Sequence, residues 1–313
     1  MEIALPRAVP VTRSCLNIIS PCTGAALIWV SDQTVDAPAA LSARSTPRFT
    51  GEASARHSPL AVNSSDPLTH TDQNKTVLVV GASGATGRLV VRQLLERGLQ
   101  VRAVARPATS LPAQLGKQAG LSVIRANLLE LNDTDVGDLI SGCNLVVSCL
   151  GHNLTWKGVF GNPRRLVRDA VRKLSDATIE RTQGEPVRLI LMNSAGCRNQ
   201  DASETSSPSH RAVIALIRWL VPPHADNEQA ADYLRTSVGH SNSKMTWVVV
   251  RPDSLRDADN VTDYSIHPSP TRSAIFDPGS TSRINVARFM ADLVTNDHLW
   301  RQWEGQMPVI YNE

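Results

Sequence analysis

The sequence contains no C-x-x-C pair, and its five cysteines are an odd number. This composition favours a reducing compartment and predicts neither a disulfide framework nor a zinc site. The eight histidines do not occur at metal-ligand spacing either, so we expect no bound metal. With a formal net charge of only +3 and no sustained basic helix, the chain is not predicted to bind nucleic acid.

Long apolar runs are also missing, so no transmembrane segment is expected. The apolar patch CLNIISPCTGAALIWV (Cys15–Val30) is interrupted by Pro21 and is too short to span a bilayer. Residues 1–74 are rich in Ser, Thr, Pro and Ala and lack hydrophobic periodicity, which predicts a mostly disordered extension or targeting segment. Arg7 and Arg13 precede the patch, which leaves open a secretory signal, an organellar transit peptide, or an upstream extension without function. The expected location is the cytoplasm, with a plastid or mitochondrion as the organellar alternative.

Three glycines at a spacing of three stand in the segment KTVLVVGASGATGRLVVRQLLERG (Lys75–Gly98). A β-branched apolar run ends at Gly81 and a pattern of helical period follows, which predicts a strand, a tight turn and a helix. Glycine lets the main chain approach a bulky anion, and the N–H groups of a first helical turn suit a pyrophosphate. No Lys-Ser or Lys-Thr follows Gly87, which excludes a nucleoside-triphosphate P-loop. The alternative is a well-packed turn that binds nothing.

Acidic residues are missing between Val101 and Leu115, around the end of the second expected strand. In a dinucleotide-binding unit an acidic residue near this position binds the ribose 2′-OH of NAD, whereas an arginine accommodates the 2′-phosphate of NADP. Arg106 ends this strand, and Arg102 and Arg88 are also available. We therefore expect NADP(H) to be preferred over NAD(H).

From residue 75 to residue 313 the chain alternates strands and helices, which predicts one dinucleotide-binding domain. The strands are continuous apolar runs, typical of a parallel sheet covered on both faces. The expected fold class is α/β: a doubly wound parallel sheet (Rossmann fold) with a small C-terminal region that covers substrate. The expected strands are Thr76–Val80, Gln100–Arg106, Leu121–Asn127, Cys143–Gly151, Val187–Asn193 and Met245–Arg251. Besides the helix after Gly87, helices are expected in DTDVGDLISG, from Asn162-Pro163 towards Arg181, in HRAVIALIRWLV, in DNEQAADYLRTSVG and in RINVARFMADLVTN.

The chain resembles the short-chain dehydrogenase/reductase superfamily, in its atypical NAD(P)-binding branch of NmrA-like and flavin and biliverdin reductase-like proteins. The segments that carry the resemblance are GASGATGR, VRAVAR, NLLE, SCLG, LMNSAG, WVVVRPDSL and SRINVARFMADLV, within Lys75–Glu313. The resemblance implies that a pyrophosphate is lined by Gly81, Ser83, Gly84, Ala85, Thr86 and Gly87, with Arg106 near the 2′-phosphate. It further implies adenine beside Asn127 and Leu128, ribose over Cys149, Leu150 and Gly151, and nicotinamide beside Pro252 and Ser254.

The superfamily's proton-transfer pair, Tyr-x-x-x-Lys, is absent, because Tyr233 is followed four residues later by Ser237. Asn227 falls about where the family's lysine stands; an asparagine there can hydrogen-bond the ribose of the cofactor but cannot lower a tyrosine's pKa. We expect Tyr233 to be a packing residue. Asp226, Asn227 and Glu228 are expected to open their helix as an acidic first turn.

In the absence of the tyrosine–lysine pair, three other side chains are candidates for contacts with the substrate or the cofactor. Ser194 matches the family's substrate-polarising serine, with a loop-capping role as the alternative. His152 follows the fourth strand and could serve as an acid, with a solvated loop histidine as the alternative. Asn193 could bond either the cofactor or the backbone.

Two functions from different classes remain open. One is an NADP(H)-dependent oxidoreductase that transfers hydride to an unidentified small substrate, with Trp156 and Phe160 as a candidate aromatic wall and Arg272 as a candidate anion contact in the loop Ile266–Phe276. The other is a non-catalytic NADP(H)-binding redox sensor or assembly factor. A third function, epimerase or dehydratase activity on a nucleotide sugar, is less favoured because the tyrosine–lysine pair is missing. Expected partners are a nicotinamide dinucleotide and a small-molecule substrate, with the chain a monomer or homodimer.

Overall fold

The computed structural model describes residues 75–109, 111–112, 115–116, 118–152, 161–202, 204, 222–274 and 276–313. Three features expected from the sequence lie outside these residues: the N-terminal segment 1–74, the aromatic pair Trp156 and Phe160, and the helix predicted in HRAVIALIRWLV.

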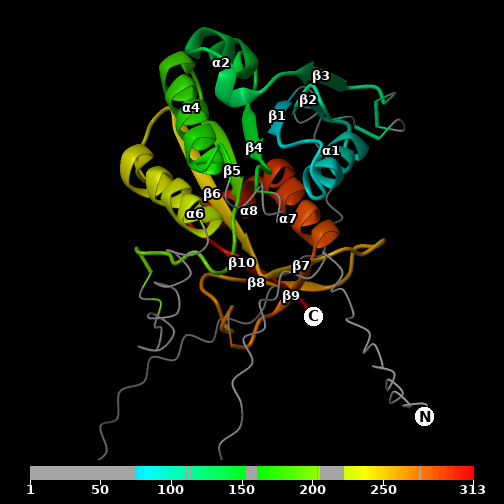
Figure 1. Cartoon of the computed structure of the whole chain (residues 1–313), viewed down its shortest axis with the longest axis vertical. Helices are drawn as coiled ribbons and strands as arrows, with labels where there is room; N and C mark the ends of the chain where they lie inside the picture. The colour runs from blue at the N-terminus through cyan, green and yellow to red at the C-terminus, as the bar shows by residue number, and fades with distance from the viewer. Residues whose placement is uncertain are drawn as a thin grey trace, which may run out of the picture.

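A mostly parallel sheet forms the centre of the described structure (Figure 1). Its order is β3-β2-β1-β4-β5-β6-β10-β8, and each neighbouring pair is parallel except β10 with β8. The strands are β1 (Thr76–Val80), β2 (Gln100–Ala105), β3 (Leu121–Arg125), β4 (Leu145–Ser148), β5 (Val187–Met192), β6 (Met245–Pro252), β8 (Tyr264–His267) and β10 (Val309–Asn312). A separate parallel pair joins β7 (Ser254–Arg256) to β9 (Ser280–Ser282). The expected Rossmann fold class is confirmed.

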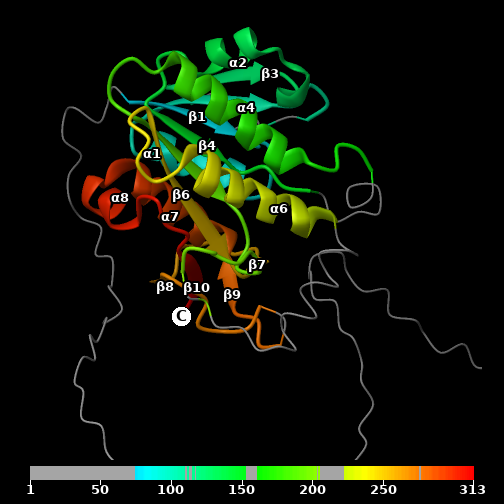
Figure 2. The same cartoon turned by 90° about the vertical axis from the view of Figure 1, so that its left-hand side faces the viewer.

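Helices cover both faces of the sheet (Figures 1 and 2). One face carries α2 (Asp133–Ile140), α4 (Leu166–Arg181) and α6 (Pro222–Tyr233), which runs into a π-helical turn, η3 (Leu234–Val238). The other carries α1 (Gly87–Glu96), α7 (Arg283–Thr295) and α8 (Asp297–Trp303). A short 3₁₀ turn, η2 (Leu128–Glu130), follows β3.

Strand β1 shows why both faces need cover. Val77 and Val79 pack into the core beneath α1 and α7, whereas Leu78 and Val80 pack into the core beneath α2 and α4. Successive side chains of a strand point to opposite faces, so an unbroken apolar run fits a sheet buried on both sides.

The C-terminal region differs from the expectation at two points. Residues 266 and 267, expected in a loop, belong to β8, which pairs with β10 at the edge of the sheet. Arg272 lies in the following loop and pairs with Asp277, with both side chains about half exposed or more. The four-residue strands β8 and β10 are too short to show a period of their own, and they form because each finds a partner. Within the described residues, no helix is both long and apolar enough to cross a membrane.

Candidate dinucleotide site and its catalytic edge

The glycine turn between β1 and α1 is closed by close backbone contacts. Gly81 has φ +74°, and a Cβ there would lie 2.7 Å from the carbonyl carbon of Cys149. A Cβ at Gly87 would lie 2.1 Å from the Gly81 carbonyl oxygen. Gly81 and Gly87 are therefore required by the turn itself. Gly84 and Ala85, in contrast, are exposed at its tip.

The turn presents the amino end of α1 at the carboxyl edge of the sheet. Thr86 is buried at the N-cap position, and its side chain makes no capping hydrogen bond. Its carbonyl accepts from the N–H groups of Leu89 and Val90 at 2.9 and 3.0 Å. The N–H groups of the first turn have no partner within the helix, which makes this end a site for a phosphate group. The site also lies between β1 and β4, where the strand order reverses and open α/β sheets bind their ligands.

Only some of the expected arginines can reach a ligand. Arg102 donates to the carbonyls of Leu139 and Ser141, at 2.6 and 2.9 Å, at the carboxyl end of α2. Its candidacy for the 2′-phosphate is therefore wrong, because the guanidinium already serves the end of this helix. Arg106 is exposed and makes no ion pair with any described residue. The loop after it is tied to the glycine turn, because Thr109 Oγ1 donates to Ser83 Oγ at 3.1 Å.

After β3 and β4, the side chains expected beside the adenine and the ribose are hydrogen-bonded to other residues or buried. Asn127 uses its side-chain amide to donate to Glu130 at 2.6 Å, and Leu128 is buried in the core. Cys149 is also buried, and burial raises the pKa of its thiol to about 12, so it is an inert apolar group. A Cβ at Gly151 would meet nothing within 4 Å, so there is open space beside this position.

His152 is not a solvated loop histidine. Its Nε2 lies 2.7 Å from Asp226 Oδ2, and the two side chains are 5% and 1% exposed. Asp226 also accepts from the backbone N–H groups of Val167 and Arg168, at 2.8 and 3.0 Å. One carboxylate therefore joins α6, the loop after β4 and the amino end of α4.

This arrangement corrects two expectations about helix starts. Helix α4 begins at Leu166 with Arg165 at its N-cap position, not with Asn162 as its cap. The capping group comes from Asp226, distant in sequence. Helix α6 already includes Pro222, so Asp226 and Glu228 do not form an acidic first turn. Capping patterns read from local sequence could not predict either helix start, because the Asp226 carboxylate of α6 caps α4 and not its own helix.

The end of β5 is joined to α6 by Asn193. Its Nδ2 donates to the Asn227 carbonyl at 2.9 Å and its Oδ1 accepts from the Ser194 N–H at 2.9 Å. Both ends of this buried amide thus serve the backbone, the second of its two expected roles. Ser194 remains partly exposed, and its Oγ accepts from the Gly196 N–H at 3.2 Å. Tyr233 packs elsewhere: it donates to Asp176 of α4, and burial and this bond raise its pKa to about 12.

Sequence reasoning missed His224, which lies on α6 beside Ser194. A Cβ at Gly196 would lie 3.4 Å from His224 Cε1 and 3.6 Å from Ser194 Oγ, so the two side chains flank one point. His224 Nε2 lies 3.5 Å from Glu228 Oε1, one helical turn further on, and both side chains are 12% exposed. The spacing of four between a histidine and a glutamate was the available signal.

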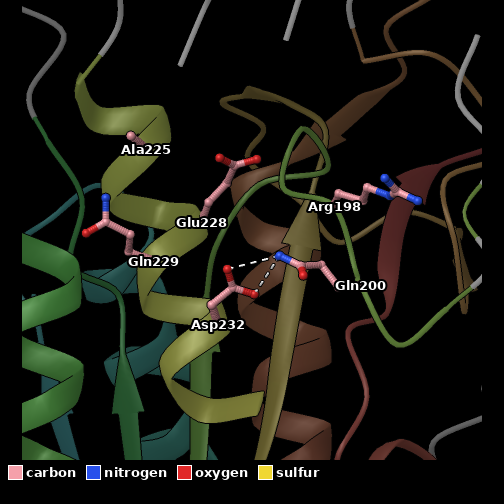
Figure 3. A pocket seen from close by; sticks show the side chains of 6 residues that line it. All are labelled: Arg198, Gln200, Ala225, Glu228, Gln229 and Asp232. Carbon is pink, nitrogen blue, oxygen red and sulfur yellow. Dashed lines mark hydrogen bonds between the residues drawn. The ribbon is translucent and has the colours of Figure 1, made fainter. Parts of the chain in front are cut away.

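Glu228 also lines a cavity of about 530 Å³ between α6 and the loop after β5 (Figure 3). The other lining residues are Arg198, Gln200, Ala225, Gln229 and Asp232. Gln200 Nε2 donates to both carboxylate oxygens of Asp232 at 3.1 Å, which links the loop after β5 to α6 (Figure 3). The lining is polar and carries both signs of charge, which suits a polar ligand.

The loop after β5 is held from below by Arg251 of β6, which is fully buried. Its guanidinium donates to the carbonyls of Met307 and Cys197, at 2.6 and 2.8 Å, and to Glu204 Oε1 at 2.8 Å. Pro252, the last residue of β6, is buried, and Ser254, the first residue of β7, is exposed. Between them, the Asp253 carboxylate accepts from the N–H groups of Ser254 and Gly279, at 2.7 and 2.9 Å. The described residues contain no group of three His, Cys, Asp or Glu side chains that could hold a metal.

Known proteins are similar to this chain in sequence and in fold. Residues 81–297 match the model of a family described as NAD(P)H-binding. An uncharacterized chloroplastic protein of Arabidopsis thaliana is 24% identical over 225 residues, 72% of this chain and 74% of its own length. The chloroplastic divinyl chlorophyllide a 8-vinyl-reductase of Cucumis sativus is 29% identical over 34% of this chain, and the match spans only 28% of that enzyme.

Solved structures agree on the fold. An oxidoreductase from Lactococcus lactis has a TM-score of 0.55 at 14% identity, over 76% of this chain and 91% of its own. A short-chain dehydrogenase/reductase from Veillonella parvula, solved with NADP, has a TM-score of 0.53 at 17% identity, over 76% and 94%. With the family match across more than half of its length, the chain belongs to the NAD(P)H-binding family.

Proposed function

We propose that the protein is an NADP(H)-dependent oxidoreductase that transfers hydride to a small substrate. The observation that carries this is the glycine turn. Its two ends are closed by backbone contacts, and its exposed tip stands at the amino end of α1 beside an arginine without an ion pair among the described residues. The bound nicotinamide would supply the hydride, and the chain's part is to position it against the substrate.

The residues at the carboxyl edge divide the work of binding. The turn from Gly81 to Gly87 would hold the pyrophosphate, and Arg106 the 2′-phosphate. The backbone of Cys149 to Gly151 would pass under the ribose, and Pro252 would border the nicotinamide. Ser194 would then face the substrate from the end of β5.

A calorimetric titration of the full-length chain with NADPH and with NADH tests the cofactor half of the proposal. An absorbance screen at the nicotinamide band with flavins, quinones and aldehydes tests the reaction. Tight NADPH binding with acceptor-dependent oxidation is expected. Tight binding with no turnover would favour the second candidate, a redox sensor, which is motivated by the bonding of Tyr233 to Asp176 and by the missing lysine.

Arg106→Ala is expected to weaken NADPH binding by about 10- to 100-fold, the loss of charge-assisted hydrogen bonds worth about 1.5–3 kcal/mol. NADH affinity should stay nearly unchanged, because NADH has no 2′-phosphate. Calorimetry with both cofactors measures the difference. Arg301→Ala, at an exposed arginine of α8, is the control and should change neither. Equal losses for both cofactors would show that the 2′-phosphate binds elsewhere.

We further propose an organellar location, in the plastid, rather than the cytoplasm. The support is that the relatives from Arabidopsis and cucumber are chloroplastic and that residues 1–74 are rich in Ser, Thr and Ala. The full chain fused at its C-terminus to a fluorescent protein should coincide with chlorophyll fluorescence in leaf cells. The same fusion without residues 1–74 should stay in the cytoplasm, and plastid import of both would refute a targeting role for this segment.

A further inference from the structure

The proposed reduction leaves one chemical need unmet, and this inference rests on that proposed function. When hydride adds to a carbonyl carbon, the oxygen must gain a proton. The family's tyrosine–lysine pair is missing, Tyr233 is bonded to Asp176, and His152 is held by Asp226. A proton donor must therefore come from another group near Ser194.

His224 stands at this place. A Cβ built on Gly196 would lie 3.6 Å from Ser194 Oγ, 3.4 Å from His224 Cε1 and 3.8 Å from His224 Nδ1. The serine hydroxyl and this side of the imidazole therefore both lie around Gly196, just after the carboxyl end of β5. In an open α/β sheet this edge is where the reacting part of a ligand lies.

The other ring nitrogen faces Glu228. His224 Nε2 is buried and has no hydrogen-bond partner among the described residues, yet it lies 3.5 Å from Glu228 Oε1. A carboxylate on this side of the ring is placed as the acidic partners that orient catalytic histidines are. Glu228 in turn is one of the residues that line the cavity beside α6.

We propose that His224, supported by Glu228, donates the proton in the reduction of a carbonyl substrate, with Ser194 polarising the carbonyl oxygen. The carbonyl carbon receives the hydride and its two electrons, and the π pair of the C=O bond moves to oxygen. The Nδ1–H bond of the imidazolium breaks and its proton forms the new O–H bond. This leaves an alcohol, oxidised NADP⁺ and a neutral imidazole, which regains its proton from water.

The test compares the full-length wild type with His224→Ala, Glu228→Gln and His240→Ala. His240 is a matched control, because it is a half-exposed histidine bonded to Asp201 outside this site. Each protein is assayed for NADPH affinity, melting temperature and NADPH oxidation with a quinone and an aromatic aldehyde. His224→Ala should lower kcat by about 100-fold, the usual contribution of a general acid, with NADPH affinity unchanged. Added imidazole should restore part of this loss, and Glu228→Gln should show a smaller fall in kcat.

Each other outcome has one meaning. If the wild type does not bind NADPH, the proposed function fails whatever His224 does. If the wild type binds NADPH but reduces no carbonyl acceptor, the proton-donor role is overturned while the cofactor site stands. If His224→Ala keeps wild-type kcat, or loses activity that imidazole does not restore, His224 is not the donor. Loss of activity in His240→Ala to the same degree would show an effect on folding and would equally refute the assignment.

Discussion

Replacing Asp226 with alanine is expected to lower the free energy of unfolding by about 3–5 kcal/mol, the cost typical of removing one partner of a buried charged contact. The carboxylate is 1% exposed and accepts from His152 and from two backbone N–H groups of α4. Without it, His152 loses this bond, and the N–H groups of Val167 and Arg168 lose the carboxylate that accepts from them, which adds to the loss. Urea unfolding of the full-length chain, followed by circular dichroism, measures the change.

Asp232→Ala is the control on the same helix. Its carboxylate is 39% exposed and contacts Gln200 and Arg235 near the surface, so its removal should cost about 1 kcal/mol or less. If both variants lost the same stability, the joining of three segments through Asp226 would have no energetic importance. Asp226→Asn should fall between the two, because an amide oxygen still accepts from α4.

Replacing Gly81 with alanine is expected to reduce the affinity for NADPH and NADH alike by at least about 100-fold. The Cβ would collide with the Cys149 backbone at 2.7 Å, so the turn and the segment after β4 must move apart. Both segments are assigned to the same ligand, and a shift of about 1 Å is enough to misplace binding groups. Calorimetric titration with both cofactors measures the loss.

Two further variants separate the causes. Gly98 has φ +75°, almost the same as Gly81, but a Cβ there meets nothing within 4 Å. Gly98→Ala should therefore cost about 1–2 kcal/mol of stability through strain and leave binding intact. Gly84→Leu places a bulky group at the exposed tip, where it should block both cofactors without unfolding the chain. Retained affinity in Gly84→Leu would mean that the turn is only structural.

Periodicity and glycine spacing predicted the parts of the fold that depend on local sequence. The bounds of β1 match the prediction residue for residue, and α4 ends at Arg181 as expected. The turn at Gly81 was recognisable because only glycine suits its backbone torsion and its contact with Cys149. The resemblance to the family predicted which residues lie around the pyrophosphate, adenine, ribose and nicotinamide.

Contacts between distant segments could not be predicted in this way. The pairing of β10 with β8 and the bond from Asp226 to His152 exist only after the sheet has assembled. Arg102 looked available because the sequence does not show that α2 ends beside it. His224 was not predicted because it lies outside the segments that resemble the family, and its one signal in the sequence is the spacing of four to Glu228.

The cavity beside α6 lies between two anchored walls. On one side, α6 is fixed by Asp226 and by the bond from Asn193 to the Asn227 carbonyl. On the other, the loop carrying Arg198 and Gln200 is fixed by the buried guanidinium of Arg251 through Cys197 and Glu204. A guanidinium that carries its charge away from water needs these partners at all times, so the wall cannot open without exposing or stranding it. The cavity is therefore preorganised: a ligand loses little affinity to ordering these walls, and ligands are selected by fit to a shape that exists before they arrive.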